Sequence, residues 1–155
     1  MKSLLILFSY HHKNTEKIAK VFAKILDAQI KTPQQVDPEE LQEYSLIGFG
    51  SGIYDEKHHK TLLDLADRLP QVANRNAFIF STSSNLEPFA KFHYPLREKL
   101  QSKGYVIIDE FSCPGLNTNS FLGYLGGMNK GRPNAEDLKH AEEFALNLKQ
   151  NLEKK

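Results

Sequence analysis

Four short stretches rich in polar side chains, two of which also contain glycine, each follow an apolar run of this sequence. They are SYHHKNTE (9–16), GSGIYDEKHHK (50–60), STSSNLE (81–87) and SCPGLNTN (112–119). No convincing pair of a general acid and a general base stands out among them. Hydroxyl, amide and backbone N–H groups instead favour a binding site for a polar or anionic ligand.

The first stretch has the character of a phosphate-binding loop. It lies between an apolar run and a helical pattern, where free backbone N–H groups and the helix dipole attract anions. Ser9, Asn14 and Thr15 add short polar side chains, and Lys13 adds a positive charge. The stretch matches neither the GxxxxGK[ST] nucleotide loop nor the GxGxxG dinucleotide turn.

The other three stretches offer an aromatic face and many small hydrogen-bonding groups. Gly50 and Gly52 allow a close approach of the backbone to a ligand, and Tyr54 follows them. The two later stretches are small and polar. If all four meet at one edge of a sheet, together they suit a planar heterocycle that carries a phosphate.

The elements that must position these stretches alternate between strands and helices. Nearly continuous apolar runs are typical of strands covered on both faces. Apolar residues at helical spacing, and start signals at Asp37-Pro38 and Asn134, indicate the helices between them. Strand and helix alternate five times, which predicts an α/β fold: a three-layer, doubly wound, five-stranded parallel sheet with its ligand beyond the carboxyl ends of the strands. The strands are expected at 3–8, 29–32, 44–49, 77–80 and 105–108, and the helices at 18–26, from 37, at 62–69, at 88–104 and from 134.

Length, composition and charge narrow the classes of protein to which this chain can belong. At 155 residues the chain is expected to form a single domain, 1–155. A formal net charge of +1 gives no broad electrostatic case for nucleic acid or an anionic membrane. No run approaches the roughly 20 apolar residues of a membrane span. The single cysteine and the short N-terminal apolar run favour a cytoplasmic location.

The arrangement of S-x-x-x-x-NT after the first strand, GSGIY after the third and STSS after the fourth resembles the flavodoxin family, over essentially the whole chain. The resemblance implies the strand order 2-1-3-4-5 of that family and FMN as a non-covalently bound cofactor. The length resembles that of short-chain members. His12 and Lys13 stand where the family usually has threonine and glycine.

The resemblance also assigns contacts to the flavin. It implies that a peptide of the GSGIY stretch turns its carbonyl toward the flavin, with Gly52 as the candidate. The STSSNLE stretch lacks the second stacking aromatic of many flavodoxins, and Phe89 is the nearest aromatic residue. The implied phosphate ligands are Ser9, His11, Lys13, Asn14 and Thr15; Gly50, Ser51, Gly52, Ile53 and Tyr54 line one side of the isoalloxazine; Thr82, Ser83 and Ser84 bind its pyrimidine edge, with Cys113 and Gly115 nearby.

Two flavin functions and one without flavin remain open. The first is a one-electron carrier between redox partner proteins, although a net charge of +1 differs from the acidic charge usual in flavodoxins. The second is an FMN-dependent NAD(P)H or quinone-type reductase with a small quinone-like substrate. The third is a module of the same fold that has lost its cofactor. Each is compatible with a monomer or a homodimer, and the carrier is favoured.

Several residues also have plain structural explanations. The pairs His11–His12 and His58–His59 could ligate zinc, but surface or ligand-adjacent roles are favoured and no metal is expected. His93 and His140 are expected to be solvated on helices. Residues 55–57 are expected to form a solvated rim. The glycine-rich segment 123–134 is interpreted as a long connection, with a cover over the ligand as the alternative.

Overall fold

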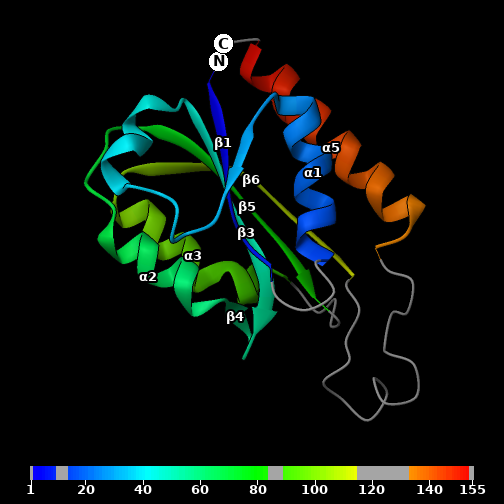
Figure 1. Cartoon of the computed structure of the whole chain (residues 1–155), viewed down its shortest axis with the longest axis horizontal. Helices are drawn as coiled ribbons and strands as arrows, with labels where there is room; N and C mark the ends of the chain where they lie inside the picture. The colour runs from blue at the N-terminus through cyan, green and yellow to red at the C-terminus, as the bar shows by residue number, and fades with distance from the viewer. Residues whose placement is uncertain (1, 10–13, 84–88, 115–132, 154–155) are drawn as a thin grey trace.

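A mostly parallel sheet forms the centre of the computed structural model, which describes residues 2–9, 14–83, 89–114 and 133–153 (Figure 1). The strands follow the order β2-β1-β3-β5-β6. They are the five strands expected from the sequence, so the order 2-1-3-4-5 is confirmed. A short strand, β4, pairs antiparallel with β3 and was not expected. The strands are β1 (Ser3–Phe8), β2 (Gln29–Lys31), β3 (Leu46–Tyr54), β4 (Lys57–His58), β5 (Arg75–Ser83) and β6 (Tyr105–Pro114).

Helices cover both faces of this sheet and give three layers. Helices α1 (Asn14–Leu26) and α5 (Ala135–Glu153) lie side by side on one face (Figure 1). On the other face lie the 3-10 helix η1 (Pro38–Glu43) and helices α2 (Lys60–Arg68) and α3 (Phe89–Ser102). The doubly wound α/β architecture expected from the sequence is therefore confirmed.

Each face of the sheet has its own apolar core, because successive strand residues point to opposite faces. On the α1/α5 face, Phe22 of α1 packs edge-on against Phe78 and Phe80 of β5, with ring centroids 5.7 and 5.2 Å apart. On the α2/α3 face the buried residues include Ile79, Leu62 and Leu96. Burial on both faces explains why the strands are continuous apolar runs in the sequence.

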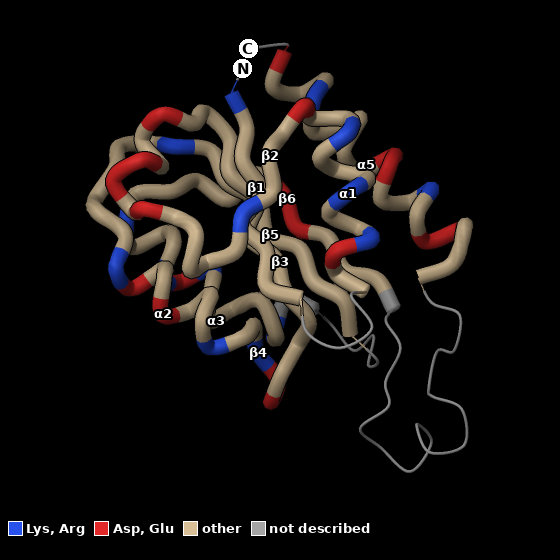
Figure 2. Tube along the Cα trace, in the orientation of Figure 1, with Lys and Arg blue, Asp and Glu red and all other residues tan. Residues whose placement is uncertain are grey.

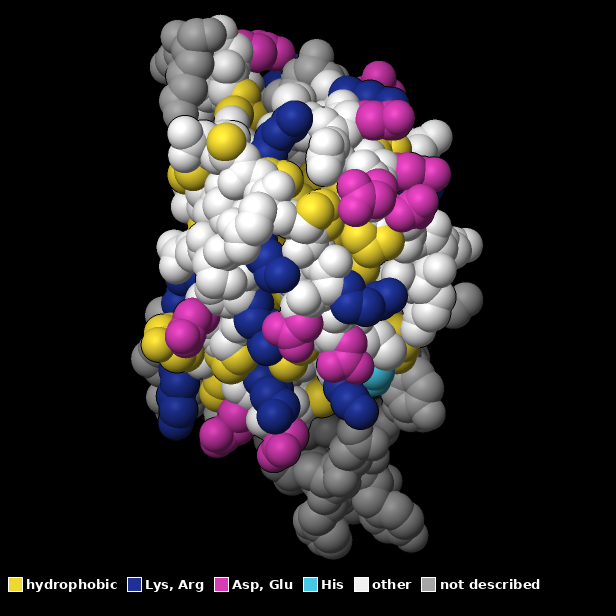
Figure 3. Space-filling view, turned by 90° about the vertical axis from the view of Figure 1, so that its left-hand side faces the viewer, with side chains coloured by type: hydrophobic (Ala, Val, Ile, Leu, Met, Phe, Trp, Pro, Cys, Tyr) yellow, Lys and Arg dark blue, Asp and Glu magenta, His cyan; other side chains and the backbone are white. Residues whose placement is uncertain are grey.

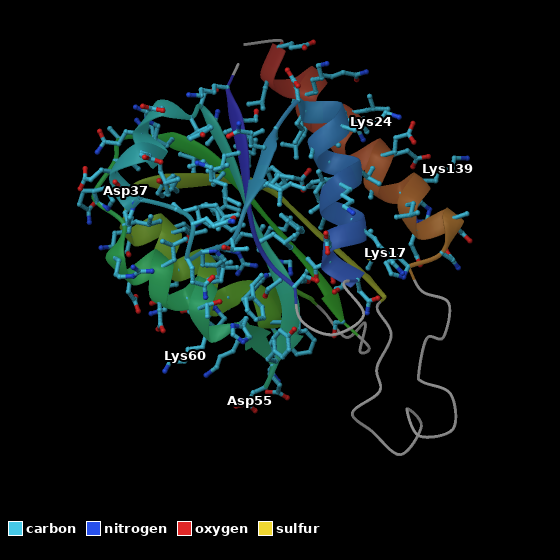
Figure 4. The ribbon with its side chains drawn as sticks, viewed as in Figure 1. Lys17, Lys24, Asp37, Asp55, Lys60 and Lys139 are labelled. Atoms are coloured by element: carbon cyan, nitrogen blue, oxygen red, sulfur yellow. The ribbon has the colours of Figure 1, made fainter. Side chains whose placement is uncertain are left out.

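Three strands continue further than the sequence indicated. Residues 50–54, 81–83 and 112–114 were expected to be loops, yet they belong to β3, β5 and β6. Parallel pairing persists to Gly52, Ser83 and Pro114, and Ile53 and Tyr54 pair with β4, so the backbones of all these residues are held in the sheet. The chain then reverses through Asp55 and Glu56, whose φ angles are 53° and 63°. Asp55 lies at the tip of this hairpin (Figure 4), and residues 55–57 are exposed, as expected.

The observed helix boundaries can be compared with the helix start and stop signals in the sequence. Asn134 Oδ1 accepts a hydrogen bond from the Asp137 N–H at 2.9 Å, and the Asp137 carboxylate accepts one from the Asn134 N–H at 2.8 Å, which confirms the expected start of α5. The start at Asp37 is also present, but it leads to a short 3-10 helix. Gly104, at φ 99°, follows the end of α3 as expected.

Charges of both signs are interleaved on the described surface. Helix α1 carries one acidic residue, Glu16, and three lysines, whereas α5 carries residues of both signs (Figure 2). Both signs are also spread over the face shown in Figure 3. Lys17, Lys24 and Lys139 project outward from these two helices (Figure 4). Within the described ranges, no helix is long and apolar enough to cross a membrane.

Candidate functional site

The carboxyl ends of β1, β3, β5 and β6 meet at the edge where α1 begins (Figure 1). Thr15, in the first turn of α1, and Thr82, near the end of β5, are both buried. Their hydroxyl oxygens lie 2.8 Å apart, at hydrogen-bond distance. The first and third polar stretches of the sequence are therefore brought into direct contact.

Ser9 marks an incomplete polar site at this edge. It follows β1 directly, and its hydroxyl oxygen is buried with no hydrogen-bond partner among the described residues. Leaving a buried hydroxyl unsatisfied costs about 1–3 kcal/mol. Ser9 and Glu16, in the first turn of α1, line the same hollow. Because N–H groups at a helix start attract anions, an anionic ligand that accepts a hydrogen bond from the Ser9 hydroxyl fits the residues present.

The GSGIY stretch is extended strand, and its first glycine serves packing. A Cβ atom on Gly50 would lie 2.2 Å from the Phe80 ring. On Gly52 its three nearest atoms would all belong to the Tyr54 side chain, the nearest at 3.3 Å. The Ser51 hydroxyl is buried, donates to the Gly52 carbonyl at 2.6 Å and accepts from the His59 N–H at 3.0 Å. The hairpin is thus tied to the start of α2.

An aromatic cluster beside this hairpin was only partly foreseen. The His59 ring stacks on Phe8, with centroids 3.7 Å apart and an angle of 12° between the planes. Tyr54 meets the same His59 ring edge-on at 5.0 Å. Tyr54 and Ile53 are partly exposed. Phe8 had no role in the sequence interpretation, and His59 had only the surface or ligand-adjacent role of its histidine pair. Their stacking depends on the β3–β4 hairpin, which was not expected.

His59 is also the N-cap of α2. Its Nδ1 accepts a hydrogen bond from the Thr61 N–H at 3.1 Å, so the neutral ring carries its proton on Nε2. Burial lowers the pKa of His59, and Asp64 opposes that shift. The neutral form required by the cap is therefore the one that its surroundings favour.

Replacing His59 by alanine removes both the cap and the stack on Phe8. We expect His59→Ala to lower the free energy of unfolding by about 1–2 kcal/mol. The measurement is urea denaturation at pH 7.5, with His140→Ala on the exposed surface of α5 as the matched control. Equal stability of the two variants would contradict this role for His59.

The expectation that His93 is solvated is wrong. Its side chain is fully buried, because it lies on the same face of α3 as Leu96 and Leu100. The spacing 93, 96, 100 was the signal in the sequence that could have shown this. His58, for which a surface role was weighed, is also buried and at 1% exposure lies against His93. His140 is exposed, as expected.

These buried histidines belong to a polar network that sequence reasoning missed. His93 Nε2 lies 2.7 Å from the Ser81 hydroxyl oxygen, and His93 Nδ1 lies 2.9 Å from a Glu110 carboxylate oxygen. Arg97 donates to both oxygens of Glu110 at 2.7 Å. Burial by itself raises the pKa of Glu110, but hydrogen bonds from His93 and Arg97, together with their charges, lower it to about 2.

The network does not form a nucleophilic site. The chain Ser81–His93–Glu110 has the residue types of a hydrolytic triad. Ser81, however, lies within a central strand and is only 1% exposed, so a substrate has no access to its hydroxyl. Burial lowers the pKa of His93, while its hydrogen bond with Glu110 raises it. The network therefore holds protons at defined atoms inside the protein and does not act on a substrate.

The remaining expected residues are placed as follows. Cys113 is buried in the core of the α1/α5 face, and Ser83 lies half-buried at the end of β5. Within the described ranges no group of three His, Cys, Asp or Glu residues is arranged to hold a metal. His11, Lys13, Ser84, Gly115, the side chain of Phe89 and residues 123–132 lie outside the described part of the chain. Their roles stay predictions.

Comparison with solved structures defines the class of fold. Flavodoxin 2 from Bacillus cereus superposes with a TM-score of 0.74 at 18% identity, over 97% of this chain and 99% of that one. A short-chain flavodoxin associated with a bacterial microcompartment gives a TM-score of 0.71 at 14% identity, over 97% and 99% of the two chains. The chain has the flavodoxin-like fold.

A closer relative shows the family. A protein of Methanocaldococcus jannaschii described as uncharacterized is 48% identical over 153 residues, covering 97% of this chain and 100% of the relative. The chain belongs to the same family as that archaeal protein. No family model matches it.

Proposed function

We propose that this protein binds FMN non-covalently at the carboxyl edge of the sheet and carries electrons between redox partner proteins. The observation that carries the proposal is the buried hydroxyl of Ser9, which has no hydrogen-bond partner among the described residues and lines one hollow with Glu16 of α1. It marks a place for an anionic acceptor, and the phosphate of FMN is such an acceptor. The flavodoxin-like fold and the contact between Thr15 and Thr82 support the same edge.

The residues divide into those that bind the phosphate and those that bind the ring. Ser9, Asn14 and Thr15 would hold the phosphate, with His11 and Lys13 completing the loop. The GSGIY strand would line one side of the isoalloxazine, with Tyr54 as its aromatic contact. Backbone N–H groups of 82–84 would bind the pyrimidine edge, near Cys113 and Gly115. When bound, FMN supplies one- and two-electron redox chemistry.

The carrier and the reductase differ in how electrons reach the flavin. The mixed surface charge and net charge of +1 do not provide the acidic surface that attracts basic partners. This observation keeps an FMN-dependent NAD(P)H or quinone-type reductase as the second candidate. A carrier needs partner proteins, whereas a reductase turns over with small molecules alone.

The deciding experiment is a visible absorption spectrum of the purified protein followed by stepwise anaerobic reduction. Flavin bands that disappear in two one-electron stages, without turnover of NAD(P)H, would support the carrier. Prompt bleaching by NADPH and turnover of a quinone would support the reductase. No flavin bands, even after FMN is added at micromolar concentration, would contradict both.

Substitutions in the phosphate loop test the position of the site. Asn14→Ala and Thr15→Ala are each expected to weaken FMN binding by about 1–3 kcal/mol, because each removes a hydrogen bond to a charged group. Fluorescence titration of the apoprotein with FMN measures the dissociation constants. Asn151→Ala, at the exposed end of α5, is the control and should bind like the parent. Parent-like affinity in both loop variants would mean that the phosphate lies elsewhere.

A further inference from the structure

The buried network lies directly behind the proposed flavin edge. Ser81 is in register with Ser51 on β3 and with Ser112 on β6, so three serines form a row across the sheet. The next row toward the carboxyl edge is Gly52, Thr82 and Cys113, as the same registers show. Because side chains alternate along a strand, the serine row faces α2 and α3, where His93 contacts Ser81.

Counting protons distinguishes two states of this network. Ionised Glu110 can only accept hydrogen bonds, so His93 Nδ1, at 2.9 Å, carries a proton. The Ser81 hydroxyl has one proton, and in this geometry it donates to the Ser112 hydroxyl at 3.0 Å. The 2.7 Å bond between Ser81 and His93 then needs a proton from His93 Nε2. With both nitrogens protonated, the His93 ring is a cation.

The alternative state has one proton fewer, on His93 Nε2, and otherwise differs only by the rotation of one hydroxyl. If Ser81 turns its proton toward His93 Nε2, the imidazole is neutral and the bond from Ser81 to Ser112 is lost. Burial favours this neutral state, and Glu110 favours the cation. Because these two effects oppose each other, both the neutral and the cationic state of His93 are accessible inside the protein.

The charges around His93 determine what shifts the balance. Among the described residues, the facing groups are Glu110 on β6, Arg97 on the same helix, and His58 on β4, whose ring centroid is 4.9 Å from that of His93. His58 donates its Nε2 proton to the Phe80 carbonyl at 3.0 Å and is held neutral by burial, which lowers its pKa to about 3. The cluster is therefore neutral with neutral His93, and carries +1 with the cation.

We propose that His93, with Ser81, Ser112 and Glu110, is an internal proton acceptor that takes up one proton when an electron is added at the proposed flavin edge. The proposal rests on the proposed function. An added negative charge at the ends of β5 and β6 attracts the cationic state, since charges in a poorly solvated interior interact strongly. His93 would act as a positioning and charge-balancing residue, without contact with the flavin.

The step balances. One electron comes from the reduced donor, one proton comes from solvent, and neutral His93 becomes the cation, so the net charge of the region is unchanged. The added proton must reach His93 Nε2, because Nδ1 already carries the proton that it donates to Glu110. Ser112 offers the route, because it is partly exposed and its hydroxyl oxygen lies 3.0 Å from that of Ser81. Ser81 gives its proton to His93 Nε2 and takes one from Ser112, which is replaced from solvent, so that the Ser81 hydroxyl then donates to Ser112.

Nitrogen-15 NMR of the histidine imidazoles in the FMN-loaded protein is the test, because the two ring nitrogens report protonation directly. The pH titration is recorded with the flavin oxidised and again fully reduced. We expect the proton affinity of His93 to rise at least about tenfold on reduction, which corresponds to 59 mV for a one-electron couple. Identical titrations in the two redox states would overturn the proposal.

Variants separate proton uptake from a merely structural role. Ser112→Ala removes the acceptor for the Ser81 proton and should lower the proton affinity of His93, while Ser112→Thr should restore it. His93→Gln should remove one proton from the pH dependence of the midpoint potential. His140→Gln, on the surface, should leave that dependence unchanged. An unchanged His93 titration in Ser112→Ala would contradict the proton count.

Failure of this inference can be told from failure of the proposed function. Retention of FMN is measured first, by absorbance after gel filtration. If FMN is retained and His93 titrates identically in both redox states, only the proton acceptor is wrong. If FMN is not retained at micromolar concentration, the proposed function is wrong, and with it the coupling to an electron.

Discussion

Acidification from pH 7 to pH 4.5 is expected to lower the free energy of unfolding by about 2.5 kcal/mol through His58 alone. His58 is 1% exposed, its Nε2 proton is donated to the Phe80 carbonyl, and its Nδ1 has no partner among the described residues. Burial, followed by the positive charge of His93 when protonated, lowers its pKa from 6.5 to about 3. The folded protein therefore holds this ring neutral.

The direction of this pH dependence follows from the number of protons bound at His58 in the folded and the unfolded protein. Between pH 6.5 and about 3 the unfolded chain binds a proton at His58 that the folded protein does not. Stability is therefore complete above pH 6.5 and falls by about 1.4 kcal/mol per pH unit as the pH decreases through this window. His93, whose pKa burial also lowers, acts in the same direction.

Urea denaturation at half-unit steps between pH 7.5 and 4.5 measures this slope. Stopping at pH 4.5 leaves out most of the contribution of Glu110, whose pKa falls from 4.5 to about 2 on folding and whose stabilisation is lost only below that window. His58→Gln keeps a donor for the Phe80 carbonyl but cannot titrate, so its slope should be smaller by one proton. Equal slopes for parent and variant would refute a buried, neutral His58.

Gly50→Ala is expected to destabilise the protein by about 3 kcal/mol or more, because it adds a methyl group to a core that is closely packed and cannot rearrange to make room. The added Cβ would lie 2.2 Å from the ring of Phe80, which is fully buried. That ring is held by Phe22 and Phe78, with centroids 5.2 and 5.8 Å away. Chemical denaturation, or loss of soluble folded protein, reports the effect.

Gly52→Ala is the matched control in the same strand. The three atoms nearest to its Cβ would all belong to the partly exposed Tyr54 side chain, the nearest at 3.3 Å, and we expect a change within about 1 kcal/mol. Phe80→Leu provides a second test, since a smaller side chain should relieve most of the cost of Gly50→Ala in the double variant. Equal stability of Gly50→Ala and Gly52→Ala would show that the glycine does not accommodate the ring.

The boundaries between the strands and the polar stretches were not predicted correctly from the sequence. STSSNLE and GSGIY were correctly placed after apolar runs, but 81–83 and 50–54 continue their strands. Polar and glycine residues are ordinarily turn formers. Here pairing with neighbouring strands overrides that preference, and pairing depends on residues distant in sequence.

The sequence by itself determined the layers, the order of elements and the edge that carries the candidate site. These follow from local patterns, because strands buried on both faces are continuous apolar runs and helices have a period of 3.6 residues. Only the tertiary structure decided that Ser81, His93 and Glu110 meet, that Gly50 lies opposite Phe80, and that His59 stacks on Phe8. Those contacts depend on strand register and helix rotation, which are set by the packing of distant segments against each other.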